Sequence, residues 1–384
     1  MAVKTSTPAQ FDTVALVLQG GGALGSYQAG VYEALARAKV TPNWIAGISI
    51  GAINTALIAG NPEETRVERL RDFWEKVSEP PLGPFGVHYN PAVQVTNEMV
   101  RVALNHTRAV GIATLGAPGF FKPRFPPSGL WGGEDPARLS YYDVAPVKET
   151  LERLVDFDRI NGGGMRMSVG AVNVRTGELV YFDTTTHRID VRHVLASGSL
   201  PPGFPATEID GEYYWDGGIV SNTPLQWVLD SKPHRDTLAF QVDLWNAKGE
   251  LPRDFTEASV RQKDIQFASR SHGALAQILG AQKFRHAFRN LYRQMPAKLK
   301  ATPEAESLAR ESHEAVYNVV QLTYRSRSYE GVSKDFEFSR RTMEEHWRAG
   351  FDDASGALSH PETLRRPDNI EGFGLFDFSR SEAG

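Results

Sequence analysis

The pentapeptide Gly47-Ile48-Ser49-Ile50-Gly51 has the G-x-S-x-G spacing that can place a nucleophilic serine on a tight turn. A serine hydroxyl is a weak nucleophile, so an enzyme that uses one must expose it and set a base beside it. The apolar run at residues 44–48 is suited to a short buried strand, and residues 52–59 are suited to a helix. The spacing therefore predicts a nucleophile elbow at Ser49, with Gly47 and Gly51 leaving room for the turn, although such a string also arises by chance in a glycine-rich chain.

A glycine-rich loop follows the apolar run at residues 14–18 and opens a segment with helical spacing; it reads Gly20-Gly21-Gly22-Ala23-Leu24-Gly25. Backbone amides at such a helix start point outward, with the positive end of the helix dipole behind them. Gly20, Gly22 and Gly25 match the dinucleotide fingerprint, but residues 40–46 lack the acidic residue it requires, and no P-loop Gly-Lys-Ser/Thr follows. We favour an oxyanion hole formed by the Gly21 and Gly22 amides over a nucleotide site or a purely structural turn.

A second chemical candidate is Asp216, which ends the aromatic strand-like run Tyr213-Tyr214-Trp215 and precedes Gly217 and Gly218. The two glycines let the backbone turn tightly, so that the carboxylate can lie against Ser49. Asp-Gly is also a common surface turn, so this motif alone is ambiguous. In combination with the elbow and the glycine loop, it predicts that Asp216 is the general base.

The alternative is a Ser-Asp-His triad, in which a histidine follows the aspartate along the chain. His234 lies in a polar segment, whereas His272, His286, His313 and His346 lie in helix-like patterns typical of surface or packing roles. Because an aspartate in direct contact with the hydroxyl can act as base, we favour a dyad. The chain has no H-E-x-x-H pair and no calcium-loop pattern, so we predict a reaction without a metal or other cofactor.

The composition is that of a soluble globular protein, with 384 residues, 41% apolar and 23% charged. The net charge of −4 gives no general attraction for nucleic acid, and the absence of cysteine excludes disulfides and thiolate chemistry. The first twelve residues do not resemble a secretory signal, and no stretch reaches the about 18 to 20 apolar residues of a membrane span. We expect a cytoplasmic protein for which peripheral contact with a membrane stays open.

Taken in order, the three motifs resemble those of the patatin-like phospholipases: the glycine loop at 20–25, the elbow at 47–51, and Asp216-Gly217-Gly218. A fourth, weaker similarity to the family lies in the run Ala196-Ser197-Gly198-Ser199-Leu200-Pro201. The resemblance covers about residues 14–224 and implies a three-layer α/β/α fold with a Ser-Asp dyad. It further implies that Ser49 is the nucleophile, Asp216 the base, and Gly20, Gly21 and Gly22 the oxyanion loop of an enzyme that hydrolyses fatty acyl esters of lipids. One departure is Leu24, where many members carry Arg or Lys.

We therefore expect an α/β fold with a mostly parallel central sheet and a catalytic domain over residues 12–245. Within it, residues 80–142 read as a loop-rich insert that can act as a lid, with Phe120, Phe121, Phe125 and Trp131 as candidate acyl or lipid contacts. Residues 246–358 read as a largely helical C-terminal region with one added strand, and residues 359–384 as a tail. Two alternative functions stay open: an esterase for a thioester or storage polyester, and a catalytically silent lipid-binding protein.

Overall fold

A nine-stranded sheet forms the centre of the molecule, with the strand order β11-β10-β9-β1-β2-β5-β8-β7 and with β6 also paired to β5. The computed structural model describes residues 11–80, 98–125, 135–327, 330–331 and 333–378. The strands of this sheet are β1 (Thr13–Leu18), β2 (Trp44–Ile48), β5 (Arg166–Asn173), β6 (Leu179–Asp183), β7 (Thr207–Ile209), β8 (Glu212–Asp216), β9 (Thr237–Asp243), β10 (Tyr317–Thr323) and β11 (Phe373–Asp377). Six neighbouring strands from β11 to β5 are parallel, whereas β6, β8 and β7 pair antiparallel, which confirms the mostly parallel sheet.

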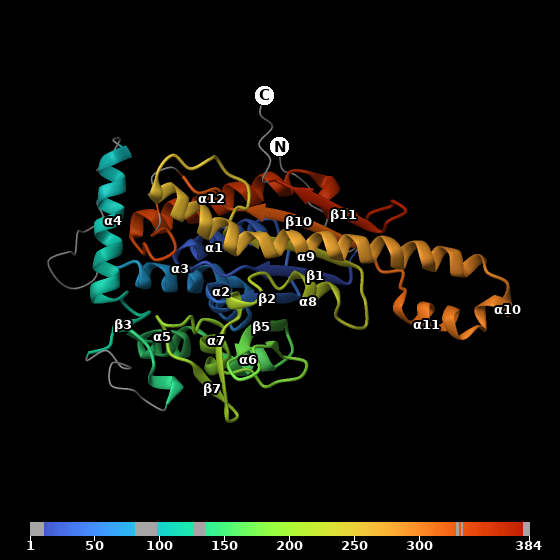
Figure 1. The fold of residues 1–384 in the computed structure, drawn as a ribbon, viewed down its shortest axis with the longest axis horizontal. Coiled ribbons are helices and arrows are strands. Elements are labelled where there is room, and N and C mark those ends of the chain that lie inside the picture. The colour runs from blue at the N-terminus through green and yellow to red at the C-terminus, as the bar shows by residue number, and fades with distance from the viewer. Residues whose placement is uncertain (1–10, 81–97, 126–134, 328–329, 332, 379–384) are drawn as a thin grey trace.

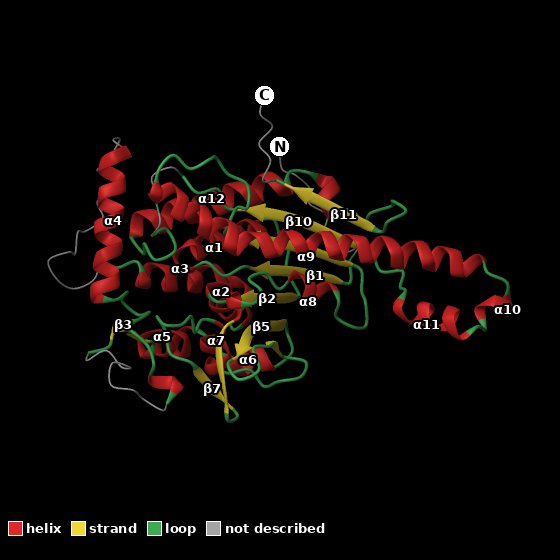
Figure 2. Cartoon of the chain, viewed as in Figure 1, coloured by secondary structure: helices red, strands yellow, loops and turns green. Residues whose placement is uncertain are grey.

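Helices cover both faces of this sheet because its central strands are apolar on both sides (Figures 1 and 2). Along β1, Leu16 and Leu18 face one core, whereas Ala15 and Val17 face the other. The first core is shared with α1 (Ser26–Arg37), α2 (Ile50–Ala59), α3 (Arg66–Val77), α5 (Ala145–Leu154), α7 (Val191–Ser197) and α12 (Arg340–Leu358). The second is shared with α8 (Leu225–Leu229) and α9 (Phe255–Gln294). The expected three-layer α/β/α architecture is therefore present.

Helix starts in the C-terminal half follow the capping residues of the sequence. The Asp254 side chain accepts a hydrogen bond from the Glu257 amide at the start of α9, and Ser339 does the same for Thr342 at the start of α12. Thr302 caps α11 (Pro303–Glu311), which has proline at its first position. After α9 passes across the sheet, it extends beyond the body of the molecule and leads into α10 (Ala297–Lys300) and α11 (Figure 1).

The C-terminal region contributes two strands to the central sheet. The one added strand predicted for this region corresponds to β10, which lies between β9 and β11. The prediction that residues 359–384 form a tail is wrong for residues 373–377, because β11 pairs with β10 in parallel register and Phe373 is buried. The run Phe373-Gly374-Leu375-Phe376-Asp377 contains glycine and aspartate, two residue types that are depleted in strands, so its sequence does not indicate an edge strand.

The insert at residues 80–142 is described in part. The helix α4 (Glu98–Leu115) stands at one end of the molecule in Figure 1, and a short ladder joins β3 (Lys122–Pro123) to β4 (Tyr142–Asp143). Residues 81–97 and 126–134, including Trp131, lie outside the described residues. The remaining short elements are α6 (Phe157–Asn161) and the 3-10 turns at Gly22–Gly25, Glu63–Thr65, Pro136–Arg138, Gly217–Ile219 and Pro361–Leu364.

Among the residues that are described, no helix combines the length and the apolar character needed to cross a lipid bilayer.

Candidate active site

Ser49 occupies the sharp turn between β2 and α2 with φ 56° and ψ −122°, a conformation that side-chain-bearing residues rarely adopt. The flanking glycines are required by close backbone contacts. A Cβ atom on Gly47 would lie 2.3 Å from the Gly51 carbonyl oxygen, and one on Gly51 would lie 2.3 Å from the Leu18 carbonyl oxygen. The Ser49 amide donates to the Ser197 hydroxyl oxygen at 3.0 Å. The close packing at Gly47 and Gly51 and the hydrogen bond to Ser197 therefore fix the strained turn in place.

The strand register brings Asp216 to the level of Ser49. Ile48 at the end of β2 pairs with Gly170 of β5, and the next residue of β5, Ala171, pairs with Asp216 of β8. The Asp216 carboxylate forms a side-chain hydrogen bond with Ser49, and its Oδ1 accepts from the Gly218 amide at 2.7 Å. The structure therefore brings together the two side chains that the sequence proposed as nucleophile and base.

Burial changes the proton affinity of this carboxyl group. Asp216 is only 3% exposed, and the loss of solvent raises its pKa to about 6, against the lowering effect of its bonds with Ser49 and Gly218. Desolvation is the largest of these effects, so it outweighs the two hydrogen bonds. A carboxylate with a pKa near 6 is a better base than an exposed one and is still largely ionised at pH 7.

The glycine loop presents two backbone donors beside Ser49. The Gly20 amide donates to the Asn222 carbonyl and the Ala23 amide to the Asp335 carbonyl, at 3.3 and 2.8 Å. Between them, the Gly21 and Gly22 amides have no hydrogen-bond partner within the part of the chain that is described. A Cβ on Gly20 would lie 3.1 Å from the Ser49 Cβ, so the loop and the elbow are in contact. Such an arrangement can stabilise negative charge that develops near Ser49.

The other motif glycines lie where the chain is crowded. A Cβ on Gly25 would lie 2.5 Å from Cγ1 of Ile50, and one on Gly217 would lie 2.6 Å from the Gly170 carbonyl oxygen. A Cβ on Gly218 would approach the Asn222 side chain to 2.8 Å. These glycines therefore allow the loop, the elbow and the Asp216 turn to pack against one another.

Ser49, Asp216 and the glycine loop line a cavity of about 440 Å³. Its walls are largely apolar and aromatic, and they include Phe120, Phe121, Phe204 and Phe338, which form a cluster of ring contacts. Phe120 and Phe121, two of the predicted acyl or lipid contacts, lie in this lining, whereas Phe125 is 97% exposed. No histidine side chain among those described lines the cavity. His234 instead stacks on His313, with ring centroids 4.0 Å apart.

Several residues that support the site were not identified from the sequence. The side-chain amide of Asn222 and the indole of Trp245 both donate to the Gly20 carbonyl oxygen, at 3.0 and 2.8 Å. The buried Gln19 side chain accepts from the Leu244 and Trp245 amides. Ser197 lies in the weaker motif at 196–201 and was the one supporting residue with a sequence signal. The others contact the loop across more than 200 positions of the chain, which no local pattern encodes.

Two family models and one relative that match this chain carry patatin phospholipase descriptions. A family model described as patatin-like phospholipase matches residues 16–229, more than half of the chain, and a second model described as patatin phospholipase matches residues 265–370. A patatin-like phospholipase domain-containing protein of Caenorhabditis elegans is 38% identical over 63 residues. This stretch is 16% of the present chain and 6% of that relative, so the chain matches only a small part of the relative's length.

Two solved structures with low sequence identity are similar over most of this chain. VipD from Legionella pneumophila has a TM-score of 0.39 at 15% identity, covering 95% of this chain and 71% of that one. The type III effector protein ExoU has a TM-score of 0.33 at 14% identity, covering 92% of this chain and 53% of that one. The family assignment rests on the sequence models, whose longer match spans the elbow, the glycine loop and Asp216. The chain therefore belongs to the patatin-like phospholipases.

Proposed function

We propose that this chain hydrolyses fatty acyl esters of lipids through an acyl-enzyme on Ser49, with Asp216 as general base. The observation that supports the proposal most strongly is the contact between the Ser49 side chain and the buried Asp216 carboxylate, beside two amides without partners and at the foot of an apolar cavity. Such a cavity suits a hydrocarbon chain, because its aromatic walls remove apolar surface from water.

In the first half of the reaction, Asp216 accepts the Ser49 proton while the Ser49 oxygen attacks the ester carbonyl carbon. The Gly21 and Gly22 amides donate to the oxyanion of the tetrahedral intermediate. Collapse of this intermediate breaks the ester bond, and Asp216 returns the proton to the departing alcohol oxygen. In the second half, Asp216 accepts a proton from water, the resulting hydroxide attacks the acyl-enzyme, and the fatty acid leaves as Ser49 regains its proton.

The test is hydrolysis of a panel that contains phospholipids, triacylglycerols, acyl thioesters and a storage polyester, with purified wild type and variants. Ser49→Ala and Asp216→Asn should each lose more than about 1,000-fold in kcat, and the double variant should lose little more, because the two residues act as one unit. Ser359→Ala, an exposed serine that does not line the cavity, is the matched control. No hydrolysis by the wild type, or full activity of Ser49→Ala, would contradict the proposal.

We also propose that α4 meets a lipid surface. Its outward side carries the exposed side chains of Val100, Val102 and Val110, whereas Arg101 is turned toward the body and pairs with Glu345 at 2.7 Å. The same side also carries the exposed His106, Thr107 and Thr114, so it is amphipathic. Its exposed valines, next to a cavity wall that includes Ala113, suit contact with the interfacial region of a bilayer.

Val110→Asp should reduce sedimentation with phosphatidylcholine vesicles several-fold and leave hydrolysis of a soluble short-chain ester unchanged. Leu308→Asp on α11, which is 40% exposed against 48% for Val110, is the control. Equal vesicle binding by Val110→Asp and wild type would remove α4 from the lipid contact.

A further inference from the structure

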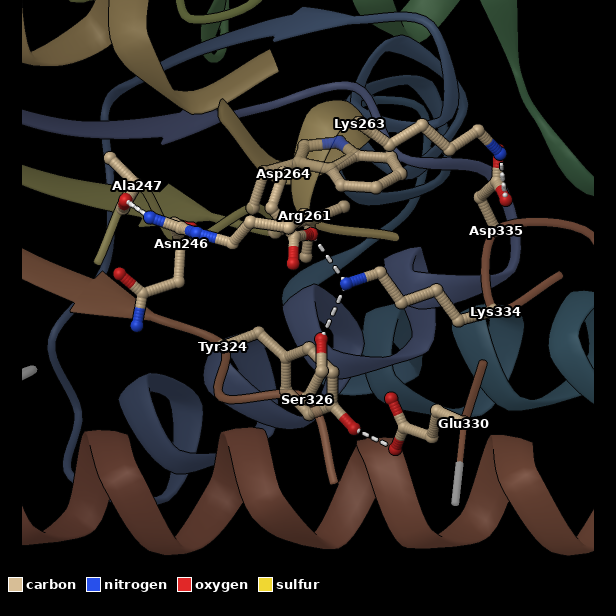
Figure 3. Close-up of polar contacts among 12 residues, drawn as sticks. Asn246, Ala247, Arg261, Lys263, Asp264, Tyr324, Ser326, Glu330, Lys334 and Asp335 are labelled. Atoms are coloured by element: carbon tan, nitrogen blue, oxygen red, sulfur yellow. Dashed lines mark hydrogen bonds and ion pairs between the residues drawn. The ribbon is translucent and has the colours of Figure 1, made fainter. Parts of the chain in front are cut away.

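Two adjacent residues of α9 form crossed ion pairs with two adjacent residues of the segment 333–338, which precedes α12 (Figure 3). Lys263 Nζ lies 2.7 and 2.8 Å from the two carboxylate oxygens of Asp335. Lys334 Nζ lies 2.5 Å from Oδ1 of Asp264. Each element thus contributes one cation and one anion, so the segment is attached to α9 at two consecutive positions.

The pair formed by Lys334 needs more precisely placed partners than the other, because its cation is buried. The Lys334 side chain is 2% exposed, and its ammonium group also lies 2.7 Å from the Ser326 hydroxyl and 5.1 Å from the centre of the Trp245 ring. A buried ammonium group is strongly unfavourable without such partners. Placing Lys334 here therefore fixes the position of its backbone, and with it the position of Asp335.

The backbone of this segment contacts the glycine loop. The Asp335 carbonyl oxygen accepts from the Ala23 amide at 2.8 Å, and a Cβ on Gly22 would lie 2.1 Å from the same oxygen. On the other side of the loop, the Trp245 indole donates to the Gly20 carbonyl oxygen at 2.8 Å. The loop is therefore held at both ends, and the Gly21 and Gly22 amides lie between the two points of attachment.

We propose that Lys263, Asp264, Lys334 and Asp335 form an ion-pair clamp that orients the Gly21 and Gly22 amides for oxyanion stabilisation. The four side chains are positioning residues, which act through the Asp335 carbonyl. This inference rests on the proposed function of Ser49 and Asp216. Because the oxyanion forms only after Ser49 attacks, a displaced loop should lower kcat and leave substrate binding nearly unchanged.

The segment also supplies Phe336 and Phe338 to the cavity wall, and this second role predicts a different result. A clamp that served only the wall would affect the KM of long-chain esters and leave short-chain esters unaffected. Comparison of a butyrate ester with a palmitate ester of the same alcohol therefore separates orientation of the amides from shaping of the acyl site.

The experiment uses Lys263→Met and Lys334→Met in the full chain, with Lys263→Arg as the conservative variant. Lys283→Met is the matched control, since Lys283 also joins α9 to the C-terminal region, through an ion pair with Glu371 at 2.7 Å. We expect kcat to fall about 10-fold to 100-fold in Lys263→Met for both esters, with KM within about twofold of wild type. Lys263→Arg should retain most of the rate, and Lys283→Met all of it.

Hydrogen exchange of the peptide that contains residues 20–25 provides a readout that does not require turnover. Exchange at the Ala23 amide should be faster in Lys263→Met than in wild type or in Lys283→Met. Unchanged exchange, a kcat within twofold of wild type, an equal loss in Lys283→Met, or an effect confined to the KM of the palmitate ester would each overturn the clamp. Lys263 is 30% exposed, so its variant tests the proposal even if Lys334→Met does not fold. An inactive wild type would contradict the proposed function, while the exchange measurement would still test the clamp.

Discussion

Burial of Asp216 makes its carboxyl group a better base and also a source of instability. The same loss of solvent that raises its pKa to about 6 makes the ionised form costly in the folded protein. At the scale of single residues, the site thus exchanges stability for reactivity, as catalytic positions often do. Ser49 also lowers the stability of the fold, because its positive φ of 56° is a strained conformation for a residue with a side chain.

The pH dependence of the reaction follows from this pKa. Because the ionised form of Asp216 is the base, kcat/KM should increase about tenfold per pH unit below pH 6 and reach a plateau above it. A profile from pH 4.5 to 8.5 with a soluble ester measures the inflection. An inflection near pH 4, the ordinary range of an exposed aspartate, would show that the buried carboxyl group does not limit the rate.

The stability of the fold should show the opposite trend. A carboxyl group whose pKa is raised on folding contributes stability below its unfolded pKa of 3.8, and this contribution is lost as the pH rises through about 6. Asp216→Asn should therefore increase the free energy of unfolding at pH 8 by up to about 3 kcal/mol and change it little at pH 3.5. Urea denaturation measures both, with Asp158→Asn, an 85% exposed aspartate, as the control. Loss of stability in Asp216→Asn at pH 8 would contradict the assigned cost of burial.

At the scale of elements, the site depends on adjacent strand ends. Parallel β1 and β2 place the glycine loop and Ser49 at the same edge of the sheet, and β8 carries Asp216 to that level from the other side of β5. The motifs and the strands that precede them could be predicted from the sequence, because each is a local pattern of glycines after an apolar run. The register that joins Ser49 to Asp216 could not, since it depends on how β5 pairs with both neighbours.

The edge strand β11 gives a prediction at this scale. Phe373 is 4% exposed in the core under α9, whereas Leu375 of the same strand is 40% exposed. Phe373→Ala should therefore lower the free energy of unfolding by about 3 to 5 kcal/mol, and Leu375→Ala by less than about 1 kcal/mol. Urea denaturation of the two variants measures the difference. Equally small effects would indicate that residues 373–377 are not packed in the sheet.

At the scale of the whole molecule, the catalytic motifs and the C-terminal region belong to one structure. Residues 333–338 lie within the second family match, and they contact a glycine loop that precedes them by about 300 positions. Nothing local in the sequence identifies that contact, because Lys334 and Asp335 read as ordinary surface charges until the fold places them against Asp264 and Lys263. The C-terminal region was predicted as a largely helical part with one added strand. That strand is β10, whereas β11 and this segment, which also complete the sheet and the cavity wall, were not identified from the sequence.

The most direct test of the central claim is the site and rate of covalent labelling by a fluorophosphonate with a long alkyl chain. Peptide mass spectrometry should find the label on Ser49, and Asp216→Asn should slow labelling by at least about 100-fold at pH 8. Labelling of a different residue, or equally rapid labelling of Ser49 in Asp216→Asn, would contradict a mechanism in which the carboxylate of Asp216 activates the hydroxyl of Ser49.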